Sequence, residues 1–356
     1  MLRIGVLGCA DIAGRRMLPS MARQPLVEVT AVASRTPARA RAFTDRFGGT
    51  PVTGYARLLE REDVDAVYLP LPPELHAQWT LRALAAGKHV LCEKPFALRY
   101  ADADKAVCLA RERGLLLMES FMFLHHSQHA RVRRLLDDGL IGELQLFGSE
   151  FGIPLRRESD GTHRRASTLP EVAAYPLRAA RLFLGPGLRV AGAHVRAAGP
   201  HGPAPAGGAL LTAPSGAAAQ LAYGVEHAYR SGYDLWGSRG RLRLERAFST
   251  PDEHVPVLHV ERGAGVEEIR LAPDAHFTNI AGVFARAVLD GEDFTPHTEA
   301  VLDHARDVGE VGVGREADLL DAGAAFDVQD GHMLVGGAEG AFQAQPSPAA
   351  PQVVSA

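Results

Sequence analysis

The 356-residue chain is short of cysteine, of long apolar runs and of excess positive charge. Its three cysteines, Cys9, Cys92 and Cys108, are an odd number without metal-ligand spacing, which argues against a disulfide framework and a zinc site. No apolar run approaches the roughly 20 residues of a membrane helix. The N-terminus resembles a core strand and lacks the zones of a secretion signal, so we expect a cytoplasmic location.

The charge balance gives no electrostatic reason to bind nucleic acid, because the formal net charge is -4 and the pI is near 6.4. One basic cluster, Arg131 to Arg134, is followed by Asp137 and Asp138 and is typical of a solvated helix face. With 46% apolar and 22% charged residues, the composition is that of a globular protein. The length predicts about two domains.

The first 122 residues alternate short apolar runs with segments of helical period. This alternation predicts βαβ units, a doubly wound parallel sheet of Rossmann type, and ligand sites at the carboxyl ends of the strands. We expect strands at Arg3–Leu7, Val27–Ala33, Ala66–Leu71, His89–Cys92 and Leu115–Met118, with helices near 11–23, 37–47, 74–86 and 101–113.

After residue 122 the pattern changes to a helix near 126–138 and then to alternating apolar runs, which predict a mostly antiparallel sheet. We therefore expect an α/β first domain over 1–122, an α+β domain with a large open sheet over 123–310, and an Ala/Gly/Pro-rich, partly disordered tail over 311–356. The stretch 199–208 is rich in Pro and Gly and predicts an exposed loop. The expected strands are Leu144–Phe151, Leu188–Arg196, Ala209–Leu211, Ala217–Tyr223, Tyr233–Gly237, Arg241–Leu244 and Val257–Glu261.

Two strand ends point to a dinucleotide. Gly8-Cys9-Ala10-Asp11-Ile12-Ala13 has the spacing of a dinucleotide fingerprint, although alanines replace its second and third glycines. The second strand ends in Ser34-Arg35 instead of the acid that usually binds the ribose of NAD. Since a serine and an arginine can bind a 2′-phosphate, NADP(H) is favoured; the alternative is an exposed arginine at a helix start.

A third strand end carries Glu93-Lys94-Pro95, after a helix, a stop at Gly87 and a buried strand. A lysine near the nicotinamide can hydrogen-bond a substrate oxygen and lower the pKa of a neighbouring proton donor. The alternative is a surface ion pair.

These motifs together, with Ala86-Gly87-Lys88-His89-Val90, resemble the glucose-fructose oxidoreductase, inositol dehydrogenase and rhizopine-catabolism family over residues 2–305. The resemblance implies a Rossmann domain followed by a domain whose open sheet mediates a dimer or tetramer, and no metal. It implies Lys94 as a catalytic residue and a cofactor site formed by Gly8, Cys9, Ala10, Asp11, Ile12, Ser34, Arg35, Leu71, Pro72, His76, Glu93 and Lys94.

Within the family, Tyr175 stands where sugar ketoreductases carry a tyrosine and inositol dehydrogenases a histidine. This resemblance implies that Tyr175 donates the proton, with a nearby ammonium bringing its pKa closer to neutral; a packed tyrosine is the alternative. The run from Ala228 to Phe248 is similar to the NADPH-dependent 3-ketoreductases of nucleotide-linked deoxysugars. The implied substrate residues are Glu119, Met122, His125, Glu171, Tyr229, Arg230 and Tyr233.

The resemblance implies NADPH-dependent reduction of the C3 keto group of a TDP-linked deoxysugar, in antibiotic deoxysugar biosynthesis. Two alternatives stay open: an NADP-dependent dehydrogenase of a free sugar, inositol or dihydrodiol, and a non-catalytic NADP(H)-binding sensor. One departure bears on the pocket, because relatives usually have an aspartate where this chain has Glu171. Thr168 and Glu171 also have capping-box spacing, and Pro176 leaves the continuity of the following helix open.

Overall fold

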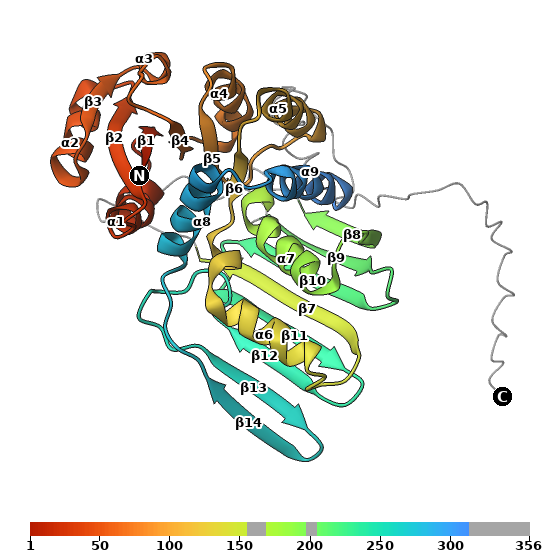
Figure 1. Ribbon diagram of the computed structural model, residues 1–356. Helices are drawn as coiled ribbons and strands as arrows, with labels where there is room; N and C mark the ends of the chain where they lie inside the picture. The colour runs from red at the N-terminus through yellow and green to blue at the C-terminus, as the bar shows by residue number, and fades with distance from the viewer. Residues whose placement is uncertain (155–168, 197–204, 313–356) are drawn as a thin grey trace, which may run out of the picture.

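The computed structural model describes residues 1–154, 169–196 and 205–312, which form two sheets with helices packed around them (Figure 1). In the first domain six parallel strands lie in the order β3-β2-β1-β4-β5-β6, the doubly wound arrangement expected from the sequence. Its strands are β1 (Leu2–Leu7), β2 (Val27–Ser34), β3 (Thr50–Thr53), β4 (Ala66–Leu69), β5 (His89–Glu93) and β6 (Leu117–Ser120).

Helices cover both faces of this sheet. The strands therefore carry apolar side chains on both sides. All four residues of β4 are buried, for example. Gly87 and Gly114 end the two helices before β5 and β6 with positive φ angles of 75° and 61°, which glycine adopts without strain. The helices are η1 (Ala13–Met17, a π-helix), α1 (Leu18–Ala22), α2 (Pro37–Phe47), α3 (Tyr55–Leu59), α4 (Pro73–Ala85) and α5 (Tyr100–Arg113).

The second sheet has eight strands in the order β14-β13-β12-β11-β7-β10-β9-β8. Only β7 and β10 pair in parallel, so the sheet is mixed and mostly antiparallel, as the alternating runs predicted. The strands are β7 (Leu144–Ile153), β8 (Arg189–Arg196), β9 (Ala206–Thr212), β10 (Ala218–Val225), β11 (Arg230–Gly237), β12 (Arg241–Glu245), β13 (Val257–Arg262) and β14 (Gly265–Arg270).

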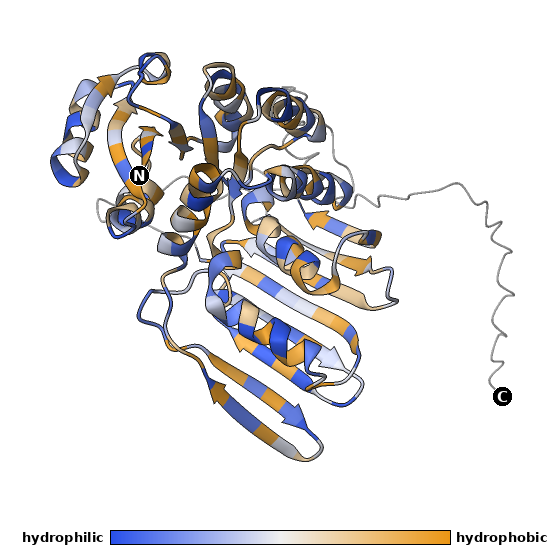
Figure 2. Ribbon diagram, in the orientation of Figure 1, coloured by the Kyte–Doolittle hydropathy of each residue, from blue (hydrophilic) through white to orange (hydrophobic). Residues whose placement is uncertain are grey.

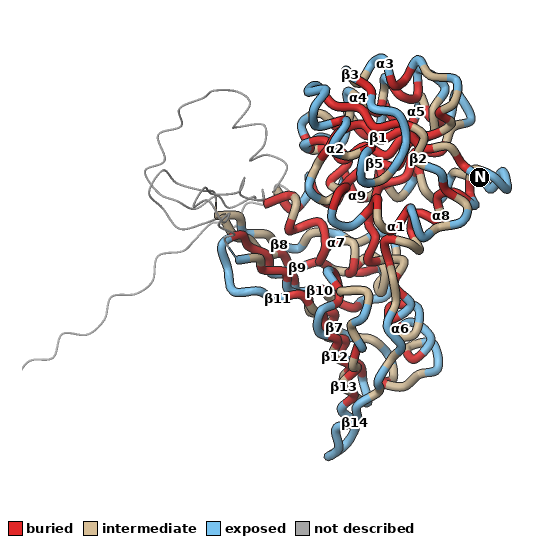
Figure 3. Tube along the Cα trace, turned by 90° about the vertical axis from the view of Figure 1, so that its left-hand side faces the viewer, coloured by how far each residue is buried: buried red, intermediate tan, exposed pale blue. Residues whose placement is uncertain are grey.

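Among the described residues, helices cover only one face of the second sheet. The short 3-10 helix η2 (Met122–His125) leads into α6 (Ser127–Asp137), and α6 and α7 (Leu169–Leu184) lie on the same face (Figure 1). Strand residues consequently alternate between apolar and polar, as the striped strands of Figure 2 show. In the described part of the chain, no helix covers the opposite face, which is exposed at several strands (Figure 3).

The last two helices return to the first domain. Helix α8 (His276–Asp290) packs against α1 and η2, and α9 (Thr295–Glu310) packs against α5, α7 and β6. Phe284 of α8 and Val301 of α9 belong to the apolar cores on the two faces of the first sheet. Residues after 275 therefore cover the first sheet, although the sequence groups them with the second domain. No helix among the described residues is long and apolar enough to cross a bilayer.

Several local predictions need correction. The helix expected over 11–23 is present, with the π-helical segment η1 continuing directly into α1, whereas the strand expected at Leu115–Met118 lies two residues later, at β6. Ala206–Gly208, expected in a loop, belong to β9 because they pair with β10 and β8. Helix α7 continues through Pro176. The capping-box prediction at Thr168 and the tail prediction beyond residue 312 lie outside the described residues.

We expect His276 to make the fold acid-sensitive. Its side chain is buried at the start of α8, and neither ring nitrogen has a hydrogen-bond partner among the described residues. Burial, aided by the nearby His126 and Arg16, lowers the pKa of His276 to about 3. The folded state therefore holds it neutral, whereas the unfolded chain takes up a proton below pH ~6.5.

The free energy of unfolding should consequently fall by about 2 kcal/mol through His276 alone when the pH drops from 7 to 5. His276→Phe removes the titrating group and should make the measured fall smaller by that amount. Urea denaturation of both proteins at the two pH values checks it, and equal losses of stability in the two proteins would count against the prediction.

Candidate active site

A cleft of about 740 Å³ lies where the strand ends of the two sheets face each other. The first domain contributes residues that follow β1, β4 and β5, because parallel strands end at the same edge of a sheet. The second domain contributes the end of β7, the end of β10, the start of β11 and the end of β12. These four ends meet at one edge, since β7 and β10 are parallel while β11 is antiparallel to both β7 and β12.

Three buried residues hold the turn that carries Lys94. The Glu93 carboxylate accepts hydrogen bonds from Tyr68 Oη at 2.8 Å and from Ser120 Oγ at 3.2 Å. Burial raises the pKa of Glu93, although the Tyr68 hydrogen bond and the Lys94 charge oppose this shift. The Lys94–Pro95 peptide bond is cis. These contacts fix the strand end from which Lys94 enters the cleft.

His76, from α4, joins two strand ends beneath the cleft. Its Nδ1 lies 2.8 Å from the Pro95 carbonyl oxygen and its Nε2 lies 2.6 Å from the Leu71 carbonyl oxygen. Burial lowers the pKa of His76, so it is neutral and donates to one of these two oxygens at a time. The imidazole thus ties the end of β4 to the turn that carries Lys94.

Glu119 supports the same turn from β6. Its carboxylate accepts a hydrogen bond of 2.7 Å from the Phe96 backbone N–H and lies 2.9 Å from Nδ1 of His304, on α9. Both side chains are buried. Glu119, predicted as a substrate residue, is not among the residues that line the cleft, and in the structure it holds the turn after Pro95.

Lys94 and Tyr175 meet across the cleft from different domains. The Lys94 ammonium donates a hydrogen bond of 3.1 Å to the Glu171 carbonyl oxygen and lies 4.4 Å from the centre of the Tyr175 ring. Both contacts come from α7, because Glu171 and Tyr175 lie one turn apart on that helix. The lysine and the tyrosine that the sequence assigned to catalysis are therefore neighbours.

An aromatic cluster holds the Tyr175 ring. Ring centres of Phe151, Phe248, Phe123 and Phe121 lie 4.5, 5.6, 5.8 and 6.2 Å from that of Tyr175. The ring is 5% exposed, and the residue still lines the cleft. Packed aromatic rings restrict each other's rotation, so the position of the hydroxyl is set by the cluster.

The two ionisable groups influence each other in opposite directions. Burial lowers the pKa of Lys94, but the neighbouring Tyr175, Glu171 and Glu93 raise it more, so the amine is charged at neutral pH. Burial raises the pKa of Tyr175, and the Lys94 charge offsets only part of this rise. The ammonium does lower the pKa of the tyrosine, as expected, but burial outweighs this effect, so the net shift is upward. A protonated phenol beside a cation suits a proton donor.

The turn after β1 fits a dinucleotide phosphate. Gly8 has a positive φ of 122°, and a Cβ at this position would lie 2.8 Å from Leu71 Cδ2, so the tight turn requires glycine. The backbone then enters a helical segment from Asp11, whose first N–H groups are suited to an anion. Ala10, Asp11 and Ile12 line the cleft, and Cys9 is buried beside them.

The end of β2 lies beside this turn, as the hydrogen bond from Gly8 N–H to the Ala33 carbonyl shows at 3.0 Å. Arg35 is exposed and forms no ion pair with a carboxylate among the described residues. Ser34 is buried, and its Oγ accepts a hydrogen bond of 3.2 Å from Thr36 N–H. Arg39, which the sequence analysis did not select, donates to the Cys9 carbonyl at 2.8 Å and adds a second guanidinium here.

The structure brings most of the predicted site residues together. Those that line the cleft are Ala10, Asp11, Ile12, Leu71, Pro72, His76, Glu93, Lys94, Met122, Glu171, Tyr175 and Tyr229. Gly8, Cys9, Ser34 and Arg35 lie at the ends of β1 and β2, next to the cleft-lining turn at Ala10. Sequence reasoning missed Arg16, Glu226, Arg246, Ser249 and Phe277, which also line it. The positions of these residues depend on which strand ends meet at one edge of the sheet, and no sequence motif indicates that arrangement.

Three predicted substrate contacts lie elsewhere. The Tyr233 side chain is buried, with its Oη 3.0 Å from His129 Nδ1, because alternation along β11 turns it toward α6. Arg230 pairs with Glu150 on the uncovered face of the second sheet. His125 does not line the cleft, and its backbone carbonyl accepts a hydrogen bond from Asn279 at 2.9 Å. The described residues contain no cluster of ligands suited to a metal ion.

Comparison with family models identifies both domains. The NAD-binding Rossmann-fold model of the GFO/IDH/MocA oxidoreductase family matches residues 2–121, and the C-terminal domain model of the same family matches residues 129–243.

Individual relatives cover almost the whole chain. The dTDP-3,4-didehydro-2,6-dideoxy-α-D-glucose 3-reductase of Actinomadura kijaniata is 48% identical over 324 residues, which are 90% of this chain and 94% of that protein. A crystal structure of a 3-ketoreductase from the same organism, in complex with NADP and TDP-benzene, superposes with a TM-score of 0.83 at 48% identity and covers 88% of this chain and 97% of the other. The NADP-dependent D-xylose 1-dehydrogenase 2 of Haloferax volcanii is 31% identical and covers 84% of this chain and 92% of its own.

We expect Arg35→Ala to weaken binding of NADPH by tenfold or more and to leave NADH binding unchanged, because a charge-assisted contact to the 2′-phosphate contributes about 1.5–3 kcal/mol. Fluorescence titration of the purified protein with each cofactor measures both dissociation constants. Arg41→Ala, an exposed arginine further along α2, is the control. Equal weakening of NADPH and NADH binding would show that Arg35 does not contact the 2′-phosphate.

Proposed function

Since the chain belongs to the GFO/IDH/MocA oxidoreductase family, we propose that it uses NADPH to reduce the C3 keto group of a dTDP-linked deoxysugar. The observation that carries the proposal is the contact of Lys94 with Tyr175 in the interdomain cleft, at 4.4 Å from ammonium to ring centre. The 48% identity to a 3-reductase of a dTDP-linked dideoxyglucose over 90% of the chain supports this substrate class.

The residues divide the chemistry between them. NADPH, when bound, supplies the hydride to the carbonyl carbon. Tyr175 holds a proton on Oη and gives it to the carbonyl oxygen as that oxygen gains charge. Lys94 donates a hydrogen bond to the same oxygen and stabilises the developing negative charge, and its ammonium then favours the tyrosinate that remains. The cleft-lining turn at Ala10 to Ile12, with Ser34 and Arg35 near it, would hold the dinucleotide.

A dehydrogenase acting on a free sugar is the alternative of the same chemistry, and the 31% identity to an NADP-dependent xylose dehydrogenase favours keeping it. The same lysine and tyrosine would serve in reverse, with the tyrosine accepting a proton. The two functions differ in nucleotide recognition, because a free-sugar enzyme has no use for TDP. A non-catalytic sensor would bind NADPH and the nucleotide sugar without hydride transfer.

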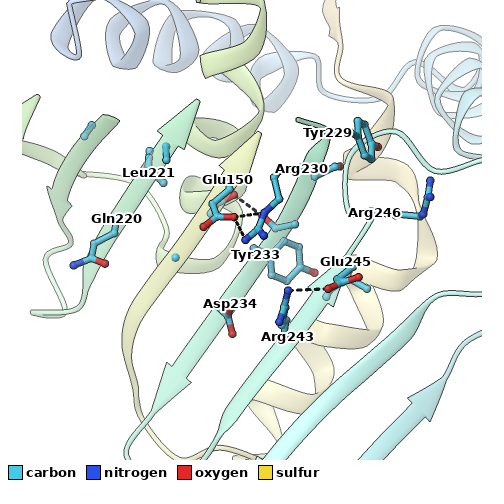
Figure 4. Close-up of a pocket in the computed structure, with 17 residues that line it drawn as sticks. Glu150, Gln220, Leu221, Tyr229, Arg230, Tyr233, Asp234, Arg243, Glu245 and Arg246 are labelled. Carbon is cyan, nitrogen blue, oxygen red and sulfur yellow. Dashed lines mark hydrogen bonds and ion pairs between the residues drawn. The ribbon is translucent and has the colours of Figure 1, made fainter. Parts of the chain in front are cut away.

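We also propose that the uncovered face of the second sheet joins two copies of the chain into a homo-oligomer. This face is hollowed over β7, β10, β11 and β12, and it carries the Glu150–Arg230 and Arg243–Glu245 ion pairs (Figure 4). Leu210 and Trp236 are 42% and 59% exposed and belong to strands of the same sheet. Exposed large apolar side chains on a sheet face that no described helix covers favour an interface. Because the proposed reaction consumes NADPH, we place the protein in the cytoplasm.

The reduction is tested by following NADPH absorbance with a dTDP-linked 3-keto-deoxysugar generated in the assay. We expect turnover by the unaltered protein and a loss of kcat of about 10² to 10⁴ in Tyr175→Phe, because the phenol is the proton donor. Lys94→Ala should lose at least as much. The control is Tyr223→Phe, since Tyr223 is also buried and its hydroxyl has no partner among the described residues.

Unchanged rates in Tyr175→Phe and Lys94→Ala would show that these two residues are not the catalytic pair. No NADPH oxidation with any 3-keto nucleotide sugar, together with turnover of a free sugar, would replace the proposed function by its alternative.

For the oligomer, we expect Trp236→Asp to shift the protein to a smaller species, because a carboxylate is costly in a closed apolar contact. Sedimentation velocity at several protein concentrations measures this shift. Leu289→Asp, on α8 and 46% exposed, is the control that should not change the assembly. If the unaltered protein sediments as a monomer, or if Trp236→Asp leaves an oligomer intact, the proposed interface is wrong.

A further inference from the structure

Two charged residues in the cleft adopt a backbone conformation that ordinary side chains avoid. Among the described residues, Glu226 at φ 57° and Arg246 at φ 52° are the only non-glycine residues with positive φ, and both line the cleft. Left-handed backbone is unfavourable for residues with a Cβ, and where surrounding contacts enforce it, the residue often has a functional reason. Both residues stand at the sheet edge that faces the first domain, after β10 and β12.

Hydrogen bonds on its C-terminal side impose the conformation of Arg246. The Ala247 N–H donates to the Ser231 carbonyl at 3.0 Å, and the Phe248 N–H donates to Ser231 Oγ at 3.1 Å. The Arg246 carbonyl itself accepts a hydrogen bond of 2.7 Å from Thr250 Oγ1. Phe248 is fully buried, and its ring centre lies 5.6 Å from that of Tyr175. The turn that fixes the catalytic tyrosine therefore also fixes the position of Arg246.

The Arg246 guanidinium lacks the kind of partner that other arginines of this sheet have. Arg230 pairs with Glu150, Arg241 with Asp234 and Arg243 with Glu245. Arg246 forms no ion pair within the described ranges, and its guanidinium carbon lies 5.8 Å from the centre of the Tyr229 ring. Figure 4 shows Tyr229 and Arg246 where the strands end, and both residues border the hollow on the uncovered face as well as the cleft.

The diphosphate of the proposed substrate class needs a cation in the cleft. Lys94 is assigned to the reacting carbonyl, and Arg16 lines the cleft from the first domain, so Arg246 is the cation that the second domain contributes. The cleft also carries the carboxylates of Asp11, Glu171 and Glu226, which repel a diphosphate. One sugar ring separates C3 from the anomeric oxygen that carries the diphosphate. Arg246 lines the same cleft as Tyr175, and it stands two residues before Phe248, whose ring packs on that tyrosine.

We infer that Arg246 binds the diphosphate of the nucleotide-linked substrate and thereby selects nucleotide sugars over free sugars. This inference rests on the proposed function. A guanidinium pairs with phosphate oxygens through two parallel hydrogen bonds, which gives both charge and geometry. The left-handed backbone at Arg246 lowers the stability of the folded state locally, and the conformation is retained because it positions the arginine for substrate binding.

The test is calorimetric titration of TDP into the full chain saturated with NADP⁺. Arg246→Gly removes the guanidinium and suits the left-handed backbone, so we expect the Kd for TDP to rise about tenfold or more while Tm does not fall. Arg246→Lys should recover part of the affinity. Glu226→Gly is the matched control, since it relieves the same backbone conformation in the same cleft but removes a negative charge, and its Kd for TDP should be unchanged or lower.

The outcomes separate the two proposals. If the unaltered protein binds TDP and Arg246→Gly binds it equally well, or if Arg246→Gly weakens NADPH binding as much as TDP binding, the assignment of Arg246 is overturned while the proposed function stands. If the unaltered protein does not bind TDP, the nucleotide-sugar function and the inference fall together.

Discussion

The ammonium of Lys94 and the ring of Tyr175 face each other from two domains, and the cleft is built around this contact. A buried cation needs compensation, and Lys94 finds it in the Glu171 carbonyl oxygen, the Tyr175 ring and the nearby Glu93. Each of these groups offsets part of the cost of burying the charge. The relative position of the turn after β5 and of helix α7 therefore depends on the lysine.

Each partner is held by a separate set of neighbours. On the Lys94 side, the buried Glu93 and Glu119 bind hydroxyl and backbone N–H groups, so the turn is held by polar contacts. On the Tyr175 side, phenylalanine rings enclose the phenol, so the tyrosine is held by packing. These two kinds of support explain the direction of the pKa shifts, because carboxylates near the lysine favour its charge and aromatic burial favours the neutral phenol.

The return of α8 and α9 to the first sheet connects the two domains more closely than their separate sheets suggest. Helix α9 supplies His304 to Glu119 beneath the catalytic turn, and α8 supplies Phe277 to the cleft. Part of the helical cover of the first sheet thus comes from residues that follow the second sheet in the chain. Loss of the C-terminal helices would expose part of the apolar core on each face of the first sheet and would remove the contact of His304 with Glu119.

Much of the fold follows from local patterns. Glycine at the turn after β1, buried runs between helices, and alternation after residue 122 are properties of neighbouring residues, so they predict strands, helices and the two kinds of sheet. The motifs at strand ends are local as well, and Lys94 and Ser34-Arg35 lie where the sequence placed them. Some short elements without strong periodicity, β3 and α3 among them, were not predicted because their stability comes from packing against the sheet.

The sequence by itself determined the fold class, and residue types at strand ends are the basis for predicting a catalytic lysine and a contact to a 2′-phosphate. Tertiary structure decided which side chains reach the cleft. Tyr233 is in the core because strand register turns it toward α6, and Glu119 is a support because His304, 185 residues later, packs beside it. Arg246 reaches the cleft only because four strand ends share one sheet edge. Contacts between distant residues depend on long-range pairing and packing, which local residue patterns do not specify.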